Sequence, residues 1–146
     1  MNTSMNFFTF RLLNTWLSMQ PDHVVTILDP QQYIPLPLAP EHVIGLISYG
    51  QTILPVFHLS LFLKMLDREK YDISQSRLLV IKIKQLEVAI PIHQTAGIEI
   101  VPKTNLSTTI LTKNGDLQKF LSHEYDGIEG LTGVLNMEQV LERARV

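Results

Sequence analysis

Ser48 is the residue whose surroundings come closest to known catalytic chemistry. It lies in the stretch GLISYG, residues 45–50, which resembles the Gly-x-Ser-x-Gly turn that presents the nucleophile of many serine hydrolases. In that turn the first glycine stands two residues before the serine, whereas Gly45 stands three residues before Ser48. The chain also lacks the alternating strands and helices on which such a turn is built. A small serine hydrolase that uses Ser48 with a histidine is therefore the weakest functional hypothesis.

The other residues that could do chemistry form no recognisable site. No two histidines stand at the i, i+2 or i, i+4 spacing that seats a metal ion, so we interpret His58 and His93, on expected strands, as hydrogen-bonded structural residues. The glycines of DGIEGLTG, residues 126–133, lack the preceding strand of a phosphate-binding loop, and a plain loop is expected there. The chain has no cysteine and no carboxylate pair beside a candidate nucleophile. The pattern therefore predicts a binding module with no catalytic residue, metal site or cofactor.

The bulk composition limits the classes of partner. The 146 residues, 45% of them hydrophobic, can bury the core of one domain, possibly of two lobes. The 12 basic and 14 acidic residues are spread along the chain, which excludes a nucleic-acid-binding face. The absence of cysteine fits a cytoplasmic setting, and the N-terminus lacks the basic region of a signal peptide.

The uncharged run from Val43 to Leu63 is long enough to cross a bilayer as a single helix. Gly50 and Pro55 would break that helix, and the polar groups of Gln51 and His58 could not be satisfied in hydrocarbon. We therefore expect no membrane insertion. A strand with two apolar faces, packed inside a small domain, is the better interpretation.

Short strands separated by turn signals dominate the expected elements and indicate a mainly β fold. In the second half, Lys82 and Lys84 should face water, with Ile81 and Ile83 inward. A proline-rich connection is expected over 33–42 and a hairpin turn at Asn114-Gly115. A short helix should follow Leu59, and a last helix should begin after Asn136 as its N-cap. The expected strands cover residues 7–12, 16–19, 24–28, 53–59, 78–84, 87–93 and 97–101.

The stretch VIGLISYGQTILPVFHL, residues 43–59, resembles the signature of CheW-like proteins, the non-catalytic couplers of bacterial chemosensory arrays. That signature reads roughly v-x-G-x-x-N-L-R-G-x-i-x-P-v-x-D-L. The resemblance extends over about residues 7–144, from the F-x-F opening at Phe8 to the closing LNMEQVL helix. It implies an all-β fold of two small packed five-stranded β-barrels with short helices, so that residues 1–146 form a single CheW-like domain. The matching signature positions are Gly45, Ile53, Pro55, Val56 and Leu59.

The chain departs from this family pattern at several positions, two of which the resemblance implies face partners. The arginine of N-L-R-G falls on Gly50, and an acidic position on the third strand falls on Thr26, two residues after the apolar Val24. Two aspartate positions fall on His58 and His93. The approach to the last helix also looks shorter than is usual in the family, as if a strand were truncated.

The resemblance implies a cytoplasmic adaptor that joins chemoreceptor-like proteins to a CheA-like histidine kinase through surface contacts. Because the signature arginine is absent, a divergent scaffold that binds another partner in a motility or type IV pilus system is the alternative. Tyr49 is the anchor candidate, since aromatic side chains make good hot spots, although a core-facing tyrosine fits equally well. The predicted partner-binding residues are Val24, Thr26, Tyr49, Gly50 and Gln51.

Overall fold

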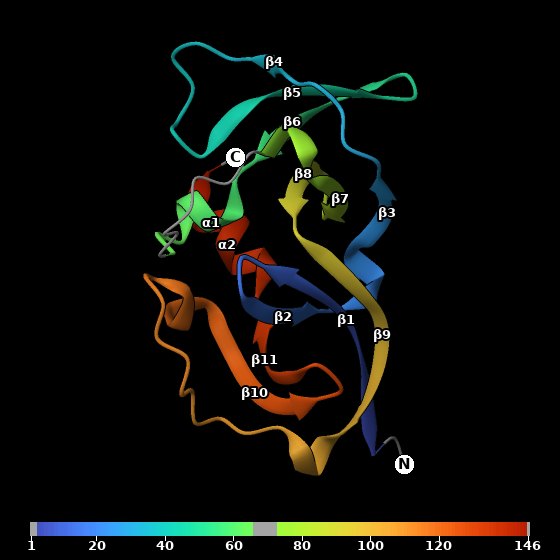
Figure 1. Cartoon of the computed structure of the whole chain (residues 1–146), viewed down its shortest axis with the longest axis vertical. Helices are drawn as coiled ribbons and strands as arrows, with labels where there is room; N and C mark the ends of the chain where they lie inside the picture. The colour runs from blue at the N-terminus through green and yellow to red at the C-terminus, as the bar shows by residue number, and fades with distance from the viewer. Residues whose placement is uncertain (1–2, 66–72, 146) are drawn as a thin grey trace.

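The computed structural model describes residues 3–65 and 73–145, which fold mainly into strands arranged in two sheets (Figure 1). The five-stranded sheet has the order β10 (Leu121–Gly127), β11 (Gly130–Leu135), β2 (Thr15–Met19), β1 (Ser4–Leu12) and β9 (Gln94–Pro102). The six-stranded sheet has the order β3 (Val24–Leu28), β7 (Arg77–Ile83), β8 (Leu86–Ile92), β6 (Thr52–Phe57), β5 (Val43–Tyr49) and β4 (Ile34–Pro35). The expectation of a mainly β fold with short helices is confirmed, and in place of two five-stranded barrels the structure has one five-stranded and one six-stranded sheet.

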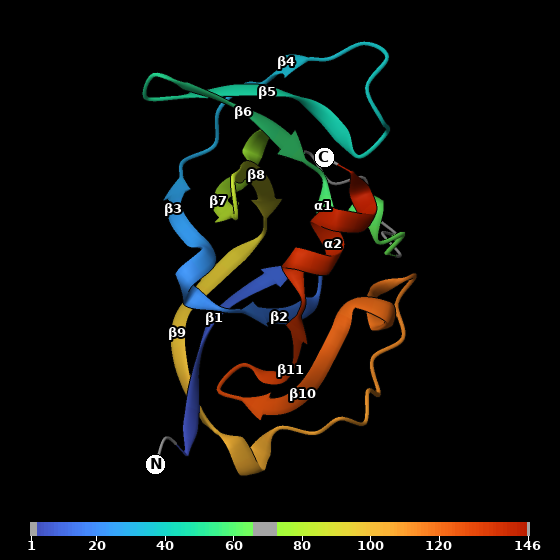
Figure 2. The same ribbon diagram turned by 180° about the vertical axis from the view of Figure 1, so that it is seen from behind.

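The helices are short and lie between or beside the sheets. Figure 1 shows α2 (Met137–Ala144) between the six-stranded sheet above and the five-stranded sheet below, and Figure 2 shows the same arrangement from behind. The helix α1 (Leu59–Phe62) directly follows β6. The 3-10 turns are η1 (Pro21–His23), η2 (Ile73–Gln75), η3 (Lys103–Asn105) and η4 (Leu117–Phe120).

One hydrophobic cluster, the shared core, joins the two sheets. Phe10 and Leu17 enter it from the five-stranded sheet, and Leu79 and Ile81 enter it from the six-stranded sheet, all fully buried. The helix α2 adds one face to the same cluster, as its sequence spacing predicts: Met137, Val140, Leu141 and Ala144. Because β7 alternates, Lys82 is exposed while Ile81 and Ile83 are buried, which confirms the expected alternation.

Each sheet also curves around a smaller cluster of its own. The cluster inside the six-stranded sheet, called here the inner cluster, contains Ile47, Leu54, Val56, Leu78, Val80 and Ala89. In the five-stranded sheet, Phe7 stacks on Tyr125 with ring centroids 5.6 Å apart. Glu99 of β9 accepts a hydrogen bond of 2.8 Å from Ile128 N in the turn after β10. The two edges of this sheet are therefore held close to each other.

The loop expected over 126–133 is wrong, because these residues belong to the β10–β11 hairpin. The strand β11 pairs with β10 on one side and, in parallel, with β2 on the other. Gly133 fits this crowded position, since a Cβ atom there would lie 2.9 Å from the side chain of Leu121. Glycine weakens local strand propensity, so this strand depends on pairing with a segment more than 100 residues away in the chain.

The hairpin expected at Asn114-Gly115 is also wrong. Gly115 has a φ of +59° and packs against the backbone carbonyls of Leu63 and Lys64, where a side chain would clash. Asp116 N donates a hydrogen bond of 2.7 Å to Leu63 O, so this glycine permits close contact of two distant loops.

The remaining differences between the expected and the observed elements concern where strands and turns begin and end. The turn between β7 and β8 is formed by Lys84 and Gln85, and Lys84 has a positive φ of 59°. The proline-rich connection contains the two-residue strand β4. The sequence also predicts Leu66 on the first helix and a polar joint over 67–76, but Leu66 and residues 67–72 lie outside the described residues.

Candidate partner-binding surface

The edge strand β3 carries a bulge at the predicted site. Val24 pairs with Ile81 and Thr26 pairs with Val80, so Val25 is an extra residue between them. Val25 is 43% exposed, whereas Val24 and Thr26 are half-buried and Val24 packs against the shared core. The structure therefore adds Val25 as the apolar side chain that β3 presents to solvent. The sequence VVTIL gives no signal of the bulge.

The β5–β6 hairpin places Gly50 and Gln51 at its tip, both exposed. Gly50 has a φ of +57°, and a Cβ atom there would have no neighbour within 4 Å. Glycine at the first position of a two-residue hairpin loop fits a type II′ turn. Space alone does not exclude a longer side chain at this position, but the left-handed backbone favours glycine.

Tyr49 links this tip to β3 through the inner cluster. The Tyr49 side chain is half-buried and packs against that cluster, and Leu28 at the end of β3 packs against it as well. Figures 1 and 2 show the hairpin tip and β3 on the same side of the molecule. The predicted residues therefore border one part of the surface. Tyr49 also contributes to packing, because part of its side chain lies against the inner cluster.

The segments that border this part of the surface carry no formal charge. Residues 24–28 and 48–53 contain no Asp, Glu, Lys or Arg, and Asp22 and Asp29 lie beyond the two ends of β3. A partner bound here would bury apolar and neutral polar groups, so we expect little electrostatic steering.

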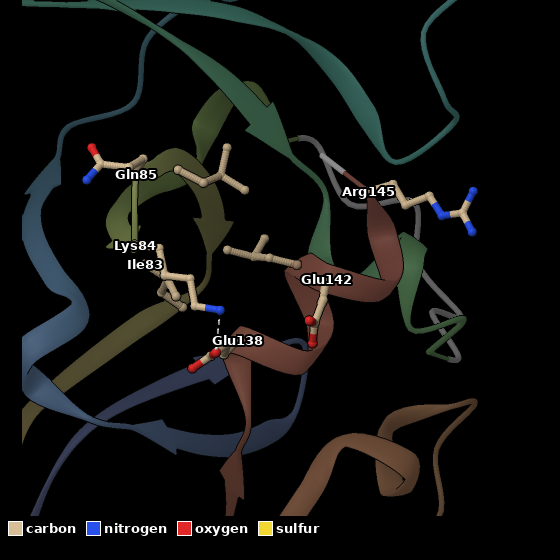
Figure 3. Close-up of a pocket in the computed structure, with 8 residues that line it drawn as sticks. Ile83, Lys84, Gln85, Glu138, Glu142 and Arg145 are labelled. Carbon is tan, nitrogen blue, oxygen red and sulfur yellow. Dashed lines mark ion pairs between the residues drawn. The ribbon is translucent and has the colours of Figure 1, made fainter.

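A separate groove of 490 Å³ lies between the β7–β8 turn and α2 (Figure 3). Its apolar lining comes from Ile83, Leu86 and Leu141, and its rim is charged. Lys84 Nζ lies 3.0 Å from Glu138 Oε1, and this hydrogen bond and charge raise the pKa of Lys84. Figure 3 shows Arg145 pointing away from the groove. Sequence analysis did not predict this groove.

Three histidines are hydrogen-bonded to neighbouring segments. His58 caps α1, where its Nδ1 accepts from Leu61 N at 3.2 Å and lies 3.1 Å from Ser60 Oγ. His93 Nδ1 accepts from Leu13 N at 2.8 Å in the β1–β2 turn. His42 Nε2 lies 3.1 Å from the carbonyl oxygen of Ala144 at the end of α2. These contacts agree with the structural interpretation of His58 and His93.

Ser48 and the possible metal ligands complete the description of the surface. Ser48 is exposed on β5 and pairs with Ile53 of β6. Within residues 3–65 and 73–145, no group of three or more His, Asp or Glu residues is placed to hold a metal ion. No helix in this part of the chain is both long and apolar enough to span a membrane.

The model of the CheW-like domain family matches residues 6–145. The chain belongs to the CheW-like family. Among solved structures, the crystal structure of the scaffolding protein TtCheW from Thermoanaerobacter tengcongensis is similar, with a TM-score of 0.75 and 14% identity. That match covers 90% of this chain and 88% of TtCheW, and it shows a shared fold. A search of curated proteins finds no matching relative.

Two of the hydrogen-bonded histidines stand at positions where the resemblance predicts aspartate. His58 and His93 each use Nδ1 to accept a backbone N–H. A neutral imidazole thus keeps the acceptor that a carboxylate would supply, without its charge.

Proposed function

We propose that this CheW-like protein is a non-catalytic chemosensory adaptor that couples receptors to a CheA-like histidine kinase in the cytoplasm. The observation that carries the proposal is the family match over residues 6–145, and the TtCheW fold supports it. The uncharged surface formed by β3 and the β5–β6 hairpin tip is the proposed contact. We also propose that residues 1–146 act as one domain, because both sheets contribute to the shared core.

A second candidate is a scaffold that binds another partner, for example in a motility or type IV pilus system. The absence of charge at Thr26 and Gly50 favours it, because the family pattern has an acid and an arginine there. A partner that places charged groups against Thr26 and Gly50 would have those charges buried with no opposite charge to pair with. Such burial lowers the affinity.

Affinity capture from the native cell extract, followed by mass spectrometry, separates the two candidates. Recovery of a CheA-like kinase with receptors supports the first, and a different stable partner without them supports the second. Val25→Asp should weaken capture in either case, because it places an unpaired charge on the contact surface. Thr108→Asp, exposed in the loop after β9 beside the other sheet, is the control for one added negative charge at an exposed position.

Tyr49→Ala tests the anchor at the hairpin. We expect weaker capture together with a stability loss of about 1 kcal/mol, since the side chain is partly buried. A large loss of stability with unchanged capture by the folded fraction would make Tyr49 a packing residue only. Absence of labelling by a serine-reactive probe is expected for an adaptor, whereas labelling at Ser48 would support the hydrolase hypothesis.

A further inference from the structure

The pair Asn114-Gly115, which forms no hairpin, is the dipeptide of this chain most prone to deamidation. In an Asn-Gly sequence the backbone nitrogen of the glycine attacks the side-chain carbonyl carbon of the asparagine, because glycine has no Cβ atom to crowd the forming ring. The other five asparagines precede residues with larger side chains. The sequence therefore favours this reaction at Asn114.

The structure leaves the reacting atoms accessible. Gly115 is exposed and Asn114 is half-buried. Among the described residues, the Gly115 N–H donates no backbone hydrogen bond, whereas the two amides that follow it are both engaged. Asp116 N donates to Leu63 O at 2.7 Å, and Leu117 N donates to Asn114 O at 3.1 Å. The backbone is thus fixed on the far side of Gly115, while no backbone acceptor holds the proton of the attacking nitrogen.

The same contact requires glycine at position 115. Gly115 has a φ of +59°, in the left-handed region that favours glycine. A Cβ atom at this position would also clash with the carbonyl oxygens of Leu63 and Lys64, in the loop after α1. A larger residue would therefore push the two loops apart. The fold thus needs the one residue that leaves the attacking nitrogen uncrowded.

We propose that Asn114 is a site of spontaneous deamidation, and that its isoaspartate product releases the 114–117 turn from Leu63. The Gly115 nitrogen forms a bond to Asn114 Cγ, and the side-chain nitrogen leaves as ammonia with the proton that Gly115 gives up. Water from the solvent then adds to either carbonyl carbon of the succinimide ring. Ring opening gives aspartate in one case and isoaspartate in the other.

Isoaspartate changes the main chain as well as the charge. Its backbone runs through the former side chain, so one methylene group is added between the Cα atom of residue 114 and Gly115 N. The bond from Leu117 N to Asn114 O closes a tight turn, which the longer chain no longer fits. Leu63 and Leu117, on the two sides of the contact, are fully buried in the shared core. The modification should therefore loosen α1 from η4.

Ageing of the purified full chain in mildly alkaline buffer, below its unfolding temperature, tests the site. Peptide mass spectrometry should show a gain of about 1 Da at Asn114, and fragmentation should identify isoaspartate. The matched control in the same sample is Asn14, which is exposed in the β1–β2 turn but precedes Thr15. Asn14 should react at least about tenfold more slowly. An unchanged Asn114, or equal rates at the two positions, would overturn the proposal.

Hydrogen exchange of the aged chain tests the release of the turn. The Asp116 N–H should exchange roughly tenfold faster than in fresh protein, because its bond to Leu63 O is lost. Asn114→Gln, aged in the same way, should keep the fresh rate, since its longer side chain closes a larger ring much more slowly. Asn114→Asp carries the new charge without the added methylene and should also stay near the fresh rate. Exchange at Asp116 no faster in the isoaspartate product than in Asn114→Asp would overturn the release.

Discussion

At the scale of single residues, Glu124 of β10 is the charged side chain with the largest structural role. It is 2% exposed, and its carboxylate accepts hydrogen bonds from Leu111 N and from the backbone and hydroxyl of Thr112. Its own backbone pairs with Ser107. The long segment between β9 and η4 is therefore fastened to β10 by one residue.

Glu124→Gln should lower the free energy of unfolding by about 1–3 kcal/mol, because the amide turns a donor toward groups that need an acceptor. Chemical denaturation measures this loss, and hydrogen exchange should become faster at Leu111 and Thr112. Glu129→Gln, at an exposed position in the β10–β11 turn, is the control and should change neither quantity. Wild-type stability in the Glu124 variant would show that the carboxylate does not hold the segment.

Tyr125 carries the other buried polar group with a testable consequence. Its hydroxyl and those of Thr9 and Ser18 are buried without a hydrogen-bond partner. Burial raises the pKa of Tyr125 above 10, although the Ser18 and Thr9 hydroxyls lie near enough to offset part of that rise. The three hydroxyls are close neighbours whose geometry forms no hydrogen bond.

A raised pKa means that the folded state favours the protonated phenol. This contribution to stability is present below pH 10 and is lost as the pH rises through the folded pKa. Wild-type protein should therefore lose stability above pH 10 more steeply than Tyr125→Phe, when both are unfolded by denaturant at a series of pH values. At neutral pH the phenylalanine variant should be at least as stable, because an unpartnered hydroxyl is removed. Parallel pH profiles would contradict this account.

At the scale of elements, the two α-helices begin in the same way. Each follows a strand, and the caps His58 and Asn136 have almost identical backbone angles, φ −85° and ψ 88° against φ −86° and ψ 87°. Asn136 Oδ1 accepts from Gln139 N at 3.1 Å, as His58 Nδ1 accepts from Leu61 N. Side-chain acceptors at this position satisfy N–H groups that the first turn leaves without an intrahelical partner.

Removal of either cap should cost about 1 kcal/mol of stability. We expect Asn136→Ala and His58→Ala to lower the thermal midpoint, and Asn136→Asp and His58→Asp to restore most of it. Differential scanning calorimetry measures the four midpoints. An alanine variant as stable as the parent would mean that water replaces the cap without loss.

The elements also show which parts of the fold can be predicted from the sequence. The alternation of β7 and the Asn136 cap depend on local spacing, and both were predictable. The strand β11 and the Val25 bulge depend on pairing with distant strands, which local patterns do not record. The expected strands also omit β5, so Gly50 is predicted as a partner-binding residue only from the family resemblance, and the exposure of Val25 is not predicted.

At the scale of the whole molecule, the two lobes repeat one plan. In each lobe a strand leads directly into a capped helix: β6 precedes α1, and β11 precedes α2. Each sheet also contains a parallel pair, β6 with β8 and β11 with β2. The similarity between the lobes lies in this order of elements. The helices of both lobes then meet in the shared core.

A shared core predicts that the two sheets unfold together. The single tryptophan, Trp16, lies on β2 of the five-stranded sheet and reports on that sheet alone. Ile81, fully buried, lies on β7 of the other sheet. Ile81→Ala should destabilise the chain by about 2–5 kcal/mol and should shift the Trp16 fluorescence midpoint in denaturant by the same amount as the circular dichroism midpoint.

The comparison variant is Lys82→Ala, on the same strand but exposed, which should move both midpoints by less than about 0.5 kcal/mol. If Ile81→Ala shifted the circular dichroism transition and left Trp16 fluorescence unchanged, the lobes would be independent folding units. Coincident shifts would instead mean that a partner bound to one sheet stabilises both.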